Sequence, residues 1–144
     1  MNPIKILALK NFPIIEPYDD LASIIDKSIY LNNIKIDDRD VFIVAQKIIS
    51  KSENRYVDLD TIEVSEEAES LASKLNKNKG LVQAIINESK KIISTEKNIL
   101  IVEHKLGFIN INAGIDQSNI SQHKNTALLL PENPTKRAID LHQK

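Results

Sequence analysis

The sequence predicts a domain of the α+β class, with a mixed sheet and helices interleaved between its strands. Short apolar runs of strand length, such as VFIVA at 41–45, recur between stretches whose apolar residues have helical spacing. Residues that commonly cap helices stand just before several of these stretches, and proline and glycine separate them. The chain has 144 residues, near the commonest size of a single domain, so we expect one domain over residues 1–144.

The first 45 residues predict a strand, a loop, a helix and a second strand. IKILAL (4–9) is typical of a strand, with every second residue on one face. NFPIIEP (11–17) contains two prolines, which exclude a central strand or a helix there, so we expect an ordered loop. Asp19 or Asp20 can cap the next helix, and VFIVA (41–45) predicts a strand buried on both faces. The residues expected on one face of that helix are Leu21, Ile24, Ile25, Ser28 and Ile29.

Residues 65–92 predict two more helices. Ser65 can cap the first of them, and Glu66 and Glu67 favour its positive end. We expect Asn78 and Gly80 to mark the end of this helix. The apolar stripe of the first helix is Ala68, Leu71, Ala72 and Leu75, and the second carries Leu81, Ala84, Ile85 and Ile92.

Strand patterns dominate the last third of the chain. NILIVEH (98–104) and GFINI (107–111) predict two strands of a hairpin that turns at KLG. ALLLP (127–131) predicts one further strand. Asn133 followed by Pro134 is a favourable cap and first-turn pair for a final helix.

Composition excludes several classes of function. The 19 basic and 20 acidic residues give a net charge of -1, which does not indicate binding to nucleic acid or to an anionic membrane. The longest apolar runs are far too short to span a bilayer and the N-terminus lacks a signal-peptide pattern, so we expect a cytoplasmic protein. There are no cysteines, which excludes disulfides, thiolate zinc sites and cysteine nucleophiles. The histidines lack the spacing of a metal site; they are His104, His123 and His142.

The segment AQKIISKSENR (45–55) is the first candidate for chemistry. Lys47, Lys51 and Arg55 are spaced four apart, so they would share one face of a helical turn. Such a cluster directly after a strand can hold phosphate, although no glycine-rich phosphate loop is present. The alternative is an ordinary solvated basic face.

The segment NAGIDQSN (112–119) is the second candidate. Asp116 offers a hard oxygen ligand of the kind that Mg²⁺ or Mn²⁺ prefers, commonly together with the phosphates of a substrate. Gly114 allows a sharp turn or a close approach of the backbone to a ligand. Asn112 and Asn119 could hydrogen-bond to a ligand. The alternative is a turn whose Asp and Asn side chains bond only to their own backbone.

Four stretches, taken together and in order, resemble the coenzyme F-420 gamma-glutamyl ligase family. They are DVFIVAQKIISKSENR (40–55), LVQAIINES (81–89), FININAGIDQSN (108–119) and LLLPENP (128–134). The resemblance runs from about residue 4 to residue 141. It implies an enzyme that joins L-glutamate to the lactyl phosphodiester tail of the deazaflavin coenzyme precursor, using GTP and either Mg²⁺ or Mn²⁺.

The same resemblance implies roles for individual residues. Asp116 would be a metal ligand, and no residue is implied to be a catalytic nucleophile. The residues implied to contact the guanine nucleotide are Phe12, Pro13, Ile14, Ile15, Gln46, Lys47, Lys51 and Asn119.

The resemblance covers roughly the N-terminal half of the family pattern. We therefore expect a partial domain that belongs to a truncated or split ligase and is inactive alone, and that forms a homodimer or associates with a complementary C-terminal half. Two alternatives stay open. The chain could be a non-catalytic module that binds guanine nucleotide, or a relative of the ligase that acts on another carboxylic acid.

Overall fold

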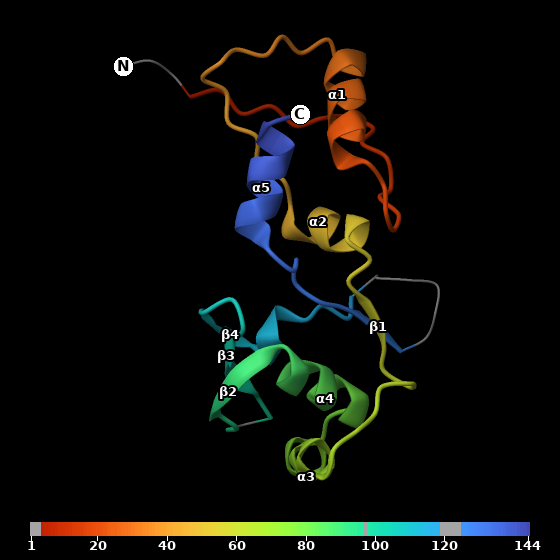
Figure 1. The fold of residues 1–144 in the computed structure, drawn as a ribbon, viewed down its shortest axis with the longest axis vertical. Helices are drawn as coiled ribbons and strands as arrows, with labels where there is room; N and C mark the ends of the chain where they lie inside the picture. The colour runs from red at the N-terminus through yellow and green to blue at the C-terminus, as the bar shows by residue number, and fades with distance from the viewer. Residues whose placement is uncertain (1–3, 97, 119–124) are drawn as a thin grey trace.

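The computed structural model describes residues 4–96, 98–118 and 125–144, and these residues confirm the predicted α+β class. Figure 1 shows two parts that lie one above the other. The upper part consists of α1 (Leu21–Leu31), α2 (Gln46–Ser52) and α5 (Pro134–His142). The lower part holds two helices and a sheet, and a pair of short strands lies between the two parts (Figure 1).

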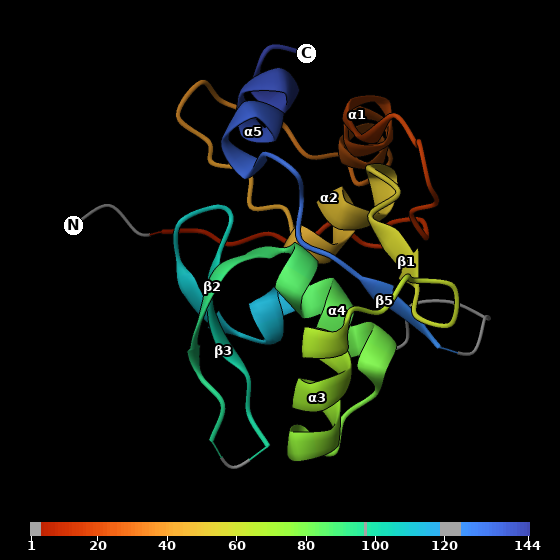
Figure 2. The same ribbon diagram turned by 60° about the horizontal axis from the view of Figure 1, so that its bottom comes forward.

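The lower part is built on a three-stranded antiparallel sheet in the order β2-β3-β4. Its strands are β2 (Ser89–Ser94), β3 (Ile101–His104) and β4 (Ile109–Ile111), so the predicted hairpin is confirmed. Helices α3 (Glu66–Leu75) and α4 (Lys79–Asn87) lie side by side in Figures 1 and 2 and contribute most of the main core. Fully buried members of this core include Val82, Ile85, Leu100 and Val102.

Local capping explains where the helices begin. The Asp20 carboxylate accepts hydrogen bonds from the first turn of α1, and the Ser65 hydroxyl accepts one from the Ala68 N–H. The Asn133 side chain accepts from the Lys136 N–H at 2.9 Å, and Pro134 occupies the first turn of α5. The three predicted helix starts are therefore confirmed.

A smaller cluster holds the upper part together. Ile15 from the predicted loop packs with Leu21 of α1 and Ile49 of α2, and each is less than a tenth exposed. Leu141 of α5 packs against the same cluster. The proline-containing segment forms no strand or helix, as predicted, yet it is anchored to α2 through Ile15.

Two short strands join the two parts. β1 (Tyr56–Asp58) and β5 (Thr126–Leu128) pair antiparallel, with Tyr56 opposite Leu128. In the described residues the strands therefore form two separate antiparallel sheets rather than the single mixed sheet that the sequence predicted. The predicted strand at 127–131 is shorter and begins one residue earlier.

Two predicted strands are wrong. Segments 4–9 and 41–45 form no strand, and Ile4, Ile6, Val41 and Ile43 are between 84% and 93% exposed. An extended apolar segment becomes a strand only when another strand lies beside it, and neither segment has such a neighbour among the described residues. The apolar pattern is local, but strand pairing depends on distant parts of a chain.

Two details of the predicted helices are also wrong. Ile92 lies in β2 rather than in the helix that contains Leu81, because α4 ends at Asn87. Gly80 does not end a helix but lies inside the first turn of α4, where a Cβ atom would overlap the Leu59 carbonyl oxygen. The glycine therefore permits a close approach between α4 and the backbone of residue 59. No helix in the described part of the chain is long and apolar enough to cross a membrane.

Candidate functional site

The two predicted clusters meet in the structure. The Lys47 Nζ atom, in the first turn of α2, lies 2.7 Å from the Asp116 Oδ2 atom. These residues are 69 positions apart, and their side chains are 41% and 30% exposed. The pair is therefore accessible from solvent, at the junction between the upper and lower parts of the molecule.

Asp116 is held in place by backbone pairing to β5. Its N–H donates to the Leu128 carbonyl at 3.0 Å, and its carbonyl accepts from the Leu128 N–H at 2.8 Å. The side chain thus projects from a position that is hydrogen-bonded to the central strand pair and not from an unpaired loop.

The segment before Asp116 turns sharply. Asn112, Ala113 and Gly114 form the short 3₁₀ turn η1 (Asn112–Gly114), and all three have positive φ values of 50°, 53° and 69°. At Gly114 a Cβ atom would also come within 3.0 Å of the Leu130 side chain, so the position suits only glycine. This turn redirects the chain from β4 toward α2, which explains why turn-forming residues crowd next to an apolar strand.

The Asp116 carboxylate has a different partner on each oxygen. Oδ1 accepts hydrogen bonds from the Ser118 N–H at 2.7 Å and the Ser118 hydroxyl at 2.6 Å, and Oδ2 faces Lys47. Burial raises the pKa of Asp116, but the hydrogen bonds from Lys47 and Ser118 outweigh it and lower the pKa to about 2. The carboxylate is consequently ionised at neutral pH.

Ser118 is a residue that the sequence analysis missed. The Asp-x-Ser spacing was a usable signal, because Asp side chains commonly accept hydrogen bonds from groups two residues later. That signal alone predicts a local turn, and only the contact with Lys47 connects it to a site.

Arg55 does not lie on the predicted basic face. Helix α2 ends at Ser52, and the Arg55 side chain turns inward, where it donates to the Leu130 carbonyl at 2.9 Å and to the Glu88 carboxylate at 2.7 Å. Lys47 and Lys51 do lie in α2 and are separated by one helical turn. The available basic pair is therefore Lys47 and Lys51.

The other predicted nucleotide contacts lie around the same helix. Ile15 is buried against α2 and Phe12 packs at the edge of that cluster, whereas Ile14 is 78% exposed. Pro13 lies between them in the same loop, and Gln46 is the first residue of α2. The predicted contact Asn119 lies outside the described residues. The loop 12–15 and α2 are thus adjoining elements, and their role in nucleotide binding stays a prediction.

The donor atoms present are compatible with one kind of metal site. In residues 4–96, 98–118 and 125–144, no group of three or more His, Asp or Glu side chains could enclose a metal ion. Mg²⁺ commonly binds one or two carboxylates and takes its other ligands from phosphates and water. Asp116 alone therefore fits a cation that arrives with a polyphosphate, and does not fit a fully protein-enclosed metal.

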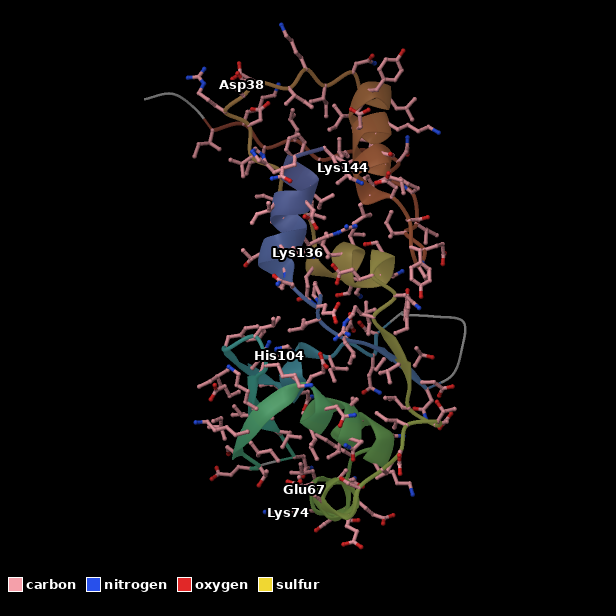
Figure 3. The ribbon with its side chains drawn as sticks, in the orientation of Figure 1. Asp38, Glu67, Lys74, His104, Lys136 and Lys144 are labelled. Carbon is pink, nitrogen blue, oxygen red and sulfur yellow. The ribbon has the colours of Figure 1, made fainter. Side chains whose placement is uncertain are left out.

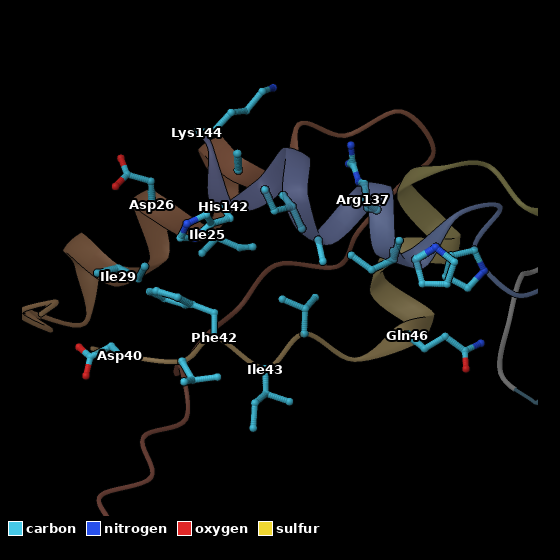
Figure 4. A pocket seen from close by; sticks show the side chains of 18 of the residues that line it. Ile25, Asp26, Ile29, Asp40, Phe42, Ile43, Gln46, Arg137, His142 and Lys144 are labelled. Carbon is cyan, nitrogen blue, oxygen red and sulfur yellow. The ribbon is translucent and has the colours of Figure 1, made fainter. Parts of the chain in front are cut away.

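A separate groove of about 1070 Å³ lies between α1, residues 40–46 and α5 (Figure 4). Ile25, Phe42 and Ile43 line it, and Arg137 lies at one side. Among the described residues predicted to contact nucleotide, only Gln46 borders this groove. The groove is therefore distinct from the Lys47–Asp116 pair.

Comparison with known proteins agrees with the resemblance noted in the sequence. Residues 10–144 match the family model described as F420-0:Gamma-glutamyl ligase. Similar relatives are three proteins named coenzyme F420:L-glutamate ligase. The relative from Methanocaldococcus jannaschii is 41% identical over 72% of this chain and 40% of its own length. The relative from Halorubrum lacusprofundi is 36% identical over 97% of this chain and 55% of its own length. The relative from Methanothermobacter thermautotrophicus is 32% identical over 91% of this chain and 51% of its own length.

The match therefore extends over nearly all of this chain, but the chain spans only about half the length of the relatives it matches. The family model covers α1 to α5 together with Lys47 and Asp116. The chain belongs to the F420-0:gamma-glutamyl ligase family.

Proposed function

We propose that this chain provides the nucleotide-phosphate and metal-binding portion of a ligase that joins L-glutamate to the deazaflavin coenzyme precursor at the expense of GTP. The observation that carries the proposal is the contact of Lys47 with Asp116 across 69 residues. A cation and a carboxylate that converge in this way can serve a polyphosphate and its metal ion. The names of the relatives support the amide-forming reaction with glutamate.

The chemistry requires charge neutralisation more than a protein nucleophile. GTP would transfer its terminal phosphoryl group to the carboxylate of the coenzyme precursor, and the glutamate amine would then displace phosphate from the acyl phosphate. Both steps concentrate negative charge on phosphate oxygens, and positioned cations lower the energy of that charge. Lys47 and Lys51, one turn apart in α2, would supply two such cations.

Asp116 would hold the divalent cation through Oδ2. When bound, Mg²⁺ or Mn²⁺ supplies further positive charge to the phosphates. For Asp116 to take this role, Lys47 has to leave Oδ2 and contact phosphate instead. Both side chains are partly exposed, so this exchange requires no rearrangement of the core.

The second candidate is a guanine-nucleotide-binding module without catalytic activity. It is favoured by the absence, among the described residues, of any group of three or more His, Asp or Glu side chains that could hold a metal ion. The two candidates differ in turnover. The ligase proposal expects GTP-dependent glutamate incorporation once the remaining half of the relatives' length is supplied, in the same chain or as a second chain. The module proposal expects nucleotide binding without incorporation in either case. A relative acting on another carboxylic acid would incorporate glutamate only with that acid.

Lys51→Ala tests the phosphate contact. A charge-assisted hydrogen bond is worth roughly 1.5–3 kcal/mol, so the substitution should weaken GDP binding about tenfold or more in calorimetry. Lys27→Ala removes an exposed lysine of α1 and should leave the affinity unchanged. Equal affinities for wild type and Lys51→Ala would show that α2 presents an ordinary solvated basic face.

Asp116→Asn tests the metal ligand. The change keeps the shape of the side chain and its tendency to form a turn, but removes the charge. We expect the folded state to survive and the Mn²⁺-dependent part of the GDP affinity to disappear. Titrating GDP with and without Mn²⁺ on both proteins separates this result from a turn role, which predicts equal Mn²⁺ dependence in the two proteins.

A further inference from the structure

The two oxygens of the Asp116 carboxylate have different partners. Oδ1 accepts both hydrogen bonds from Ser118, while Oδ2 faces Lys47 of α2. The Ser118 carbonyl also lies 3.5 Å from the Lys47 Nζ atom, at the outer limit of a hydrogen bond. One serine therefore contacts both charged members of the candidate site.

We propose that Ser118 is a positioning residue that saturates Oδ1 of Asp116 and so directs Oδ2 toward Lys47 and toward a cation delivered with the nucleotide. This inference rests on the proposed function, because it assumes that Asp116 binds such a cation. It adds a residue to which neither the sequence motifs nor the comparisons assign a role.

The two oxygens of an ionised aspartate are equivalent, but the carboxylate can rotate, and without the Ser118 contacts its plane would have no fixed orientation relative to Lys47. The two hydrogen bonds of 2.7 and 2.6 Å to a single oxygen restrict that rotation. Groups that hydrogen-bond to a metal-ligating carboxylate hold it in the binding orientation, and removing them typically lowers metal affinity about 10- to 100-fold.

The competing explanation is a purely local turn, in which Asp116 and Ser118 only stabilise their own loop. That explanation accounts for the contacts at Oδ1. It gives no reason for Oδ2 to meet a lysine from another element at 2.7 Å. The two explanations predict different effects on Mn²⁺ binding, which allows a decisive test.

The test compares three serine variants with the wild type. Ser118→Ala removes the hydroxyl contact and keeps the backbone N–H contact, and Ser118→Thr restores a hydroxyl. Ser23→Ala is the matched control, because the Ser23 hydroxyl donates to the Asp20 carboxylate at 2.8 Å at the start of α1, an exposed position on a different element from Lys47 and Asp116. Each protein is titrated with GDP in the presence and absence of Mn²⁺, and thermal unfolding confirms that each is folded.

We expect Ser118→Ala to reduce the Mn²⁺-dependent part of the GDP affinity about tenfold or more, and Ser118→Thr to restore most of it. The Mn²⁺-dependent affinity of Ser23→Ala should equal that of wild type. In the Asp116→Asn background, Ser118→Ala should cause no further loss, since its effect acts through that carboxylate.

If Mn²⁺ raises the GDP affinity of Ser118→Ala as much as that of wild type, this inference alone is overturned. If Ser118→Ala loses the same factor of GDP affinity with and without Mn²⁺, the inference is overturned in favour of the local turn. An absence of Mn²⁺ dependence in wild type would overturn the metal role of Asp116, and this inference with it.

Discussion

Among the described residues, His104 is the titratable acid or base that is buried. Its side chain is 3% exposed, its ring stacks on Phe108 with centroids 5.0 Å apart, and it lies in the lower part of the molecule (Figure 3). The Nδ1 atom accepts a hydrogen bond from the Leu106 N–H at 2.9 Å. Since Nδ1 is an acceptor, the neutral ring carries its proton on Nε2. Protonation would place a second proton on Nδ1 and break the contact that shapes the β3–β4 turn.

His104 should make the stability of the fold depend on pH. Burial lowers the pKa of His104 below its usual 6.5; the nearby Glu88 carboxylate acts in the opposite direction, and Arg55 and Lys105 add to the lowering. The unfolded chain therefore takes up a proton at a higher pH than the folded chain. The contribution of the neutral ring is fully present above about pH 6.5 and is lost as the pH falls below that value.

Urea unfolding between pH 8 and pH 5 measures this effect. The free energy of unfolding of wild type should fall below pH 6.5, and His104→Asn, which keeps an acceptor near the Leu106 N–H, should show a smaller fall. His142→Asn replaces an exposed histidine of α5 and should keep the wild-type pH dependence. Identical pH profiles for wild type and His104→Asn would contradict the assignment of the effect to this ring.

At the scale of elements, the sequence predicted what depends on neighbouring residues and failed where distant residues decide. The helix starts at Asp20, Ser65 and Asn133 were predictable because a capping side chain bonds to a backbone group two or three residues away. The segments 4–9 and 41–45 were not, because their apolar pattern is the same with or without a pairing strand.

In the candidate site, too, local sequence predicted some features and long-range contacts decided the others. Lys47 and Asp116 were each identified from local motifs, and family resemblance linked them. Their 2.7 Å contact depends on the β1–β5 pairing that no local pattern contains. Arg55 was misassigned because its spacing suits a helix, whereas the helix ends three residues earlier and long-range partners draw the guanidinium inward.

Gly80 is a position where one element closely approaches another. A Cβ atom there would overlap the carbonyl of Leu59 and approach the Ile62 side chain at 3.1 Å. Alanine favours a helix over glycine by about 1 kcal/mol, but the backbone of residue 59 would have to move. We expect Gly80→Ala to lower the free energy of unfolding by about 1–3 kcal/mol, the usual range for overpacking.

Chemical denaturation of Gly80→Ala and of its neighbour Lys79→Ala tests this expectation. Lys79 is exposed and forms a surface ion pair with Glu69 at 3.4 Å, so its loss should cost less than about 1 kcal/mol. A Gly80→Ala variant as stable as wild type would mean that α4 does not require the close approach to residue 59.

At the scale of the whole molecule, Arg55 connects the two parts that Figure 1 separates. It follows α2, and its side chain reaches both the Leu130 carbonyl ahead of α5 and the Glu88 carboxylate at the end of α4. Its backbone carbonyl also accepts from the Leu129 N–H at 3.0 Å. The Arg55 and Glu88 side chains are only 22% and 14% exposed. The candidate site lies at this same junction, so the connection also supports the placement of Asp116 opposite α2.

Removing one partner of this pair should therefore affect the whole fold. Arg55→Met leaves the Glu88 carboxylate partly buried beside His104 without its main counter-charge, and Glu88→Gln removes the charge while keeping one acceptor. Leaving a buried polar partner unsatisfied costs about 1–3 kcal/mol, so Arg55→Met should lower the free energy of unfolding by that amount. Glu88→Gln should cost less. The double variant should lose less stability than the sum of the two single losses, because the second change removes the uncompensated charge that the first creates.

Hydrogen exchange at the Leu128 and Leu129 amides should accelerate in Arg55→Met, since both amides donate hydrogen bonds at the junction. Strictly additive losses with unchanged exchange at these amides would show instead that the β1–β5 pair alone holds the two parts, and that Arg55 only fills its own pocket.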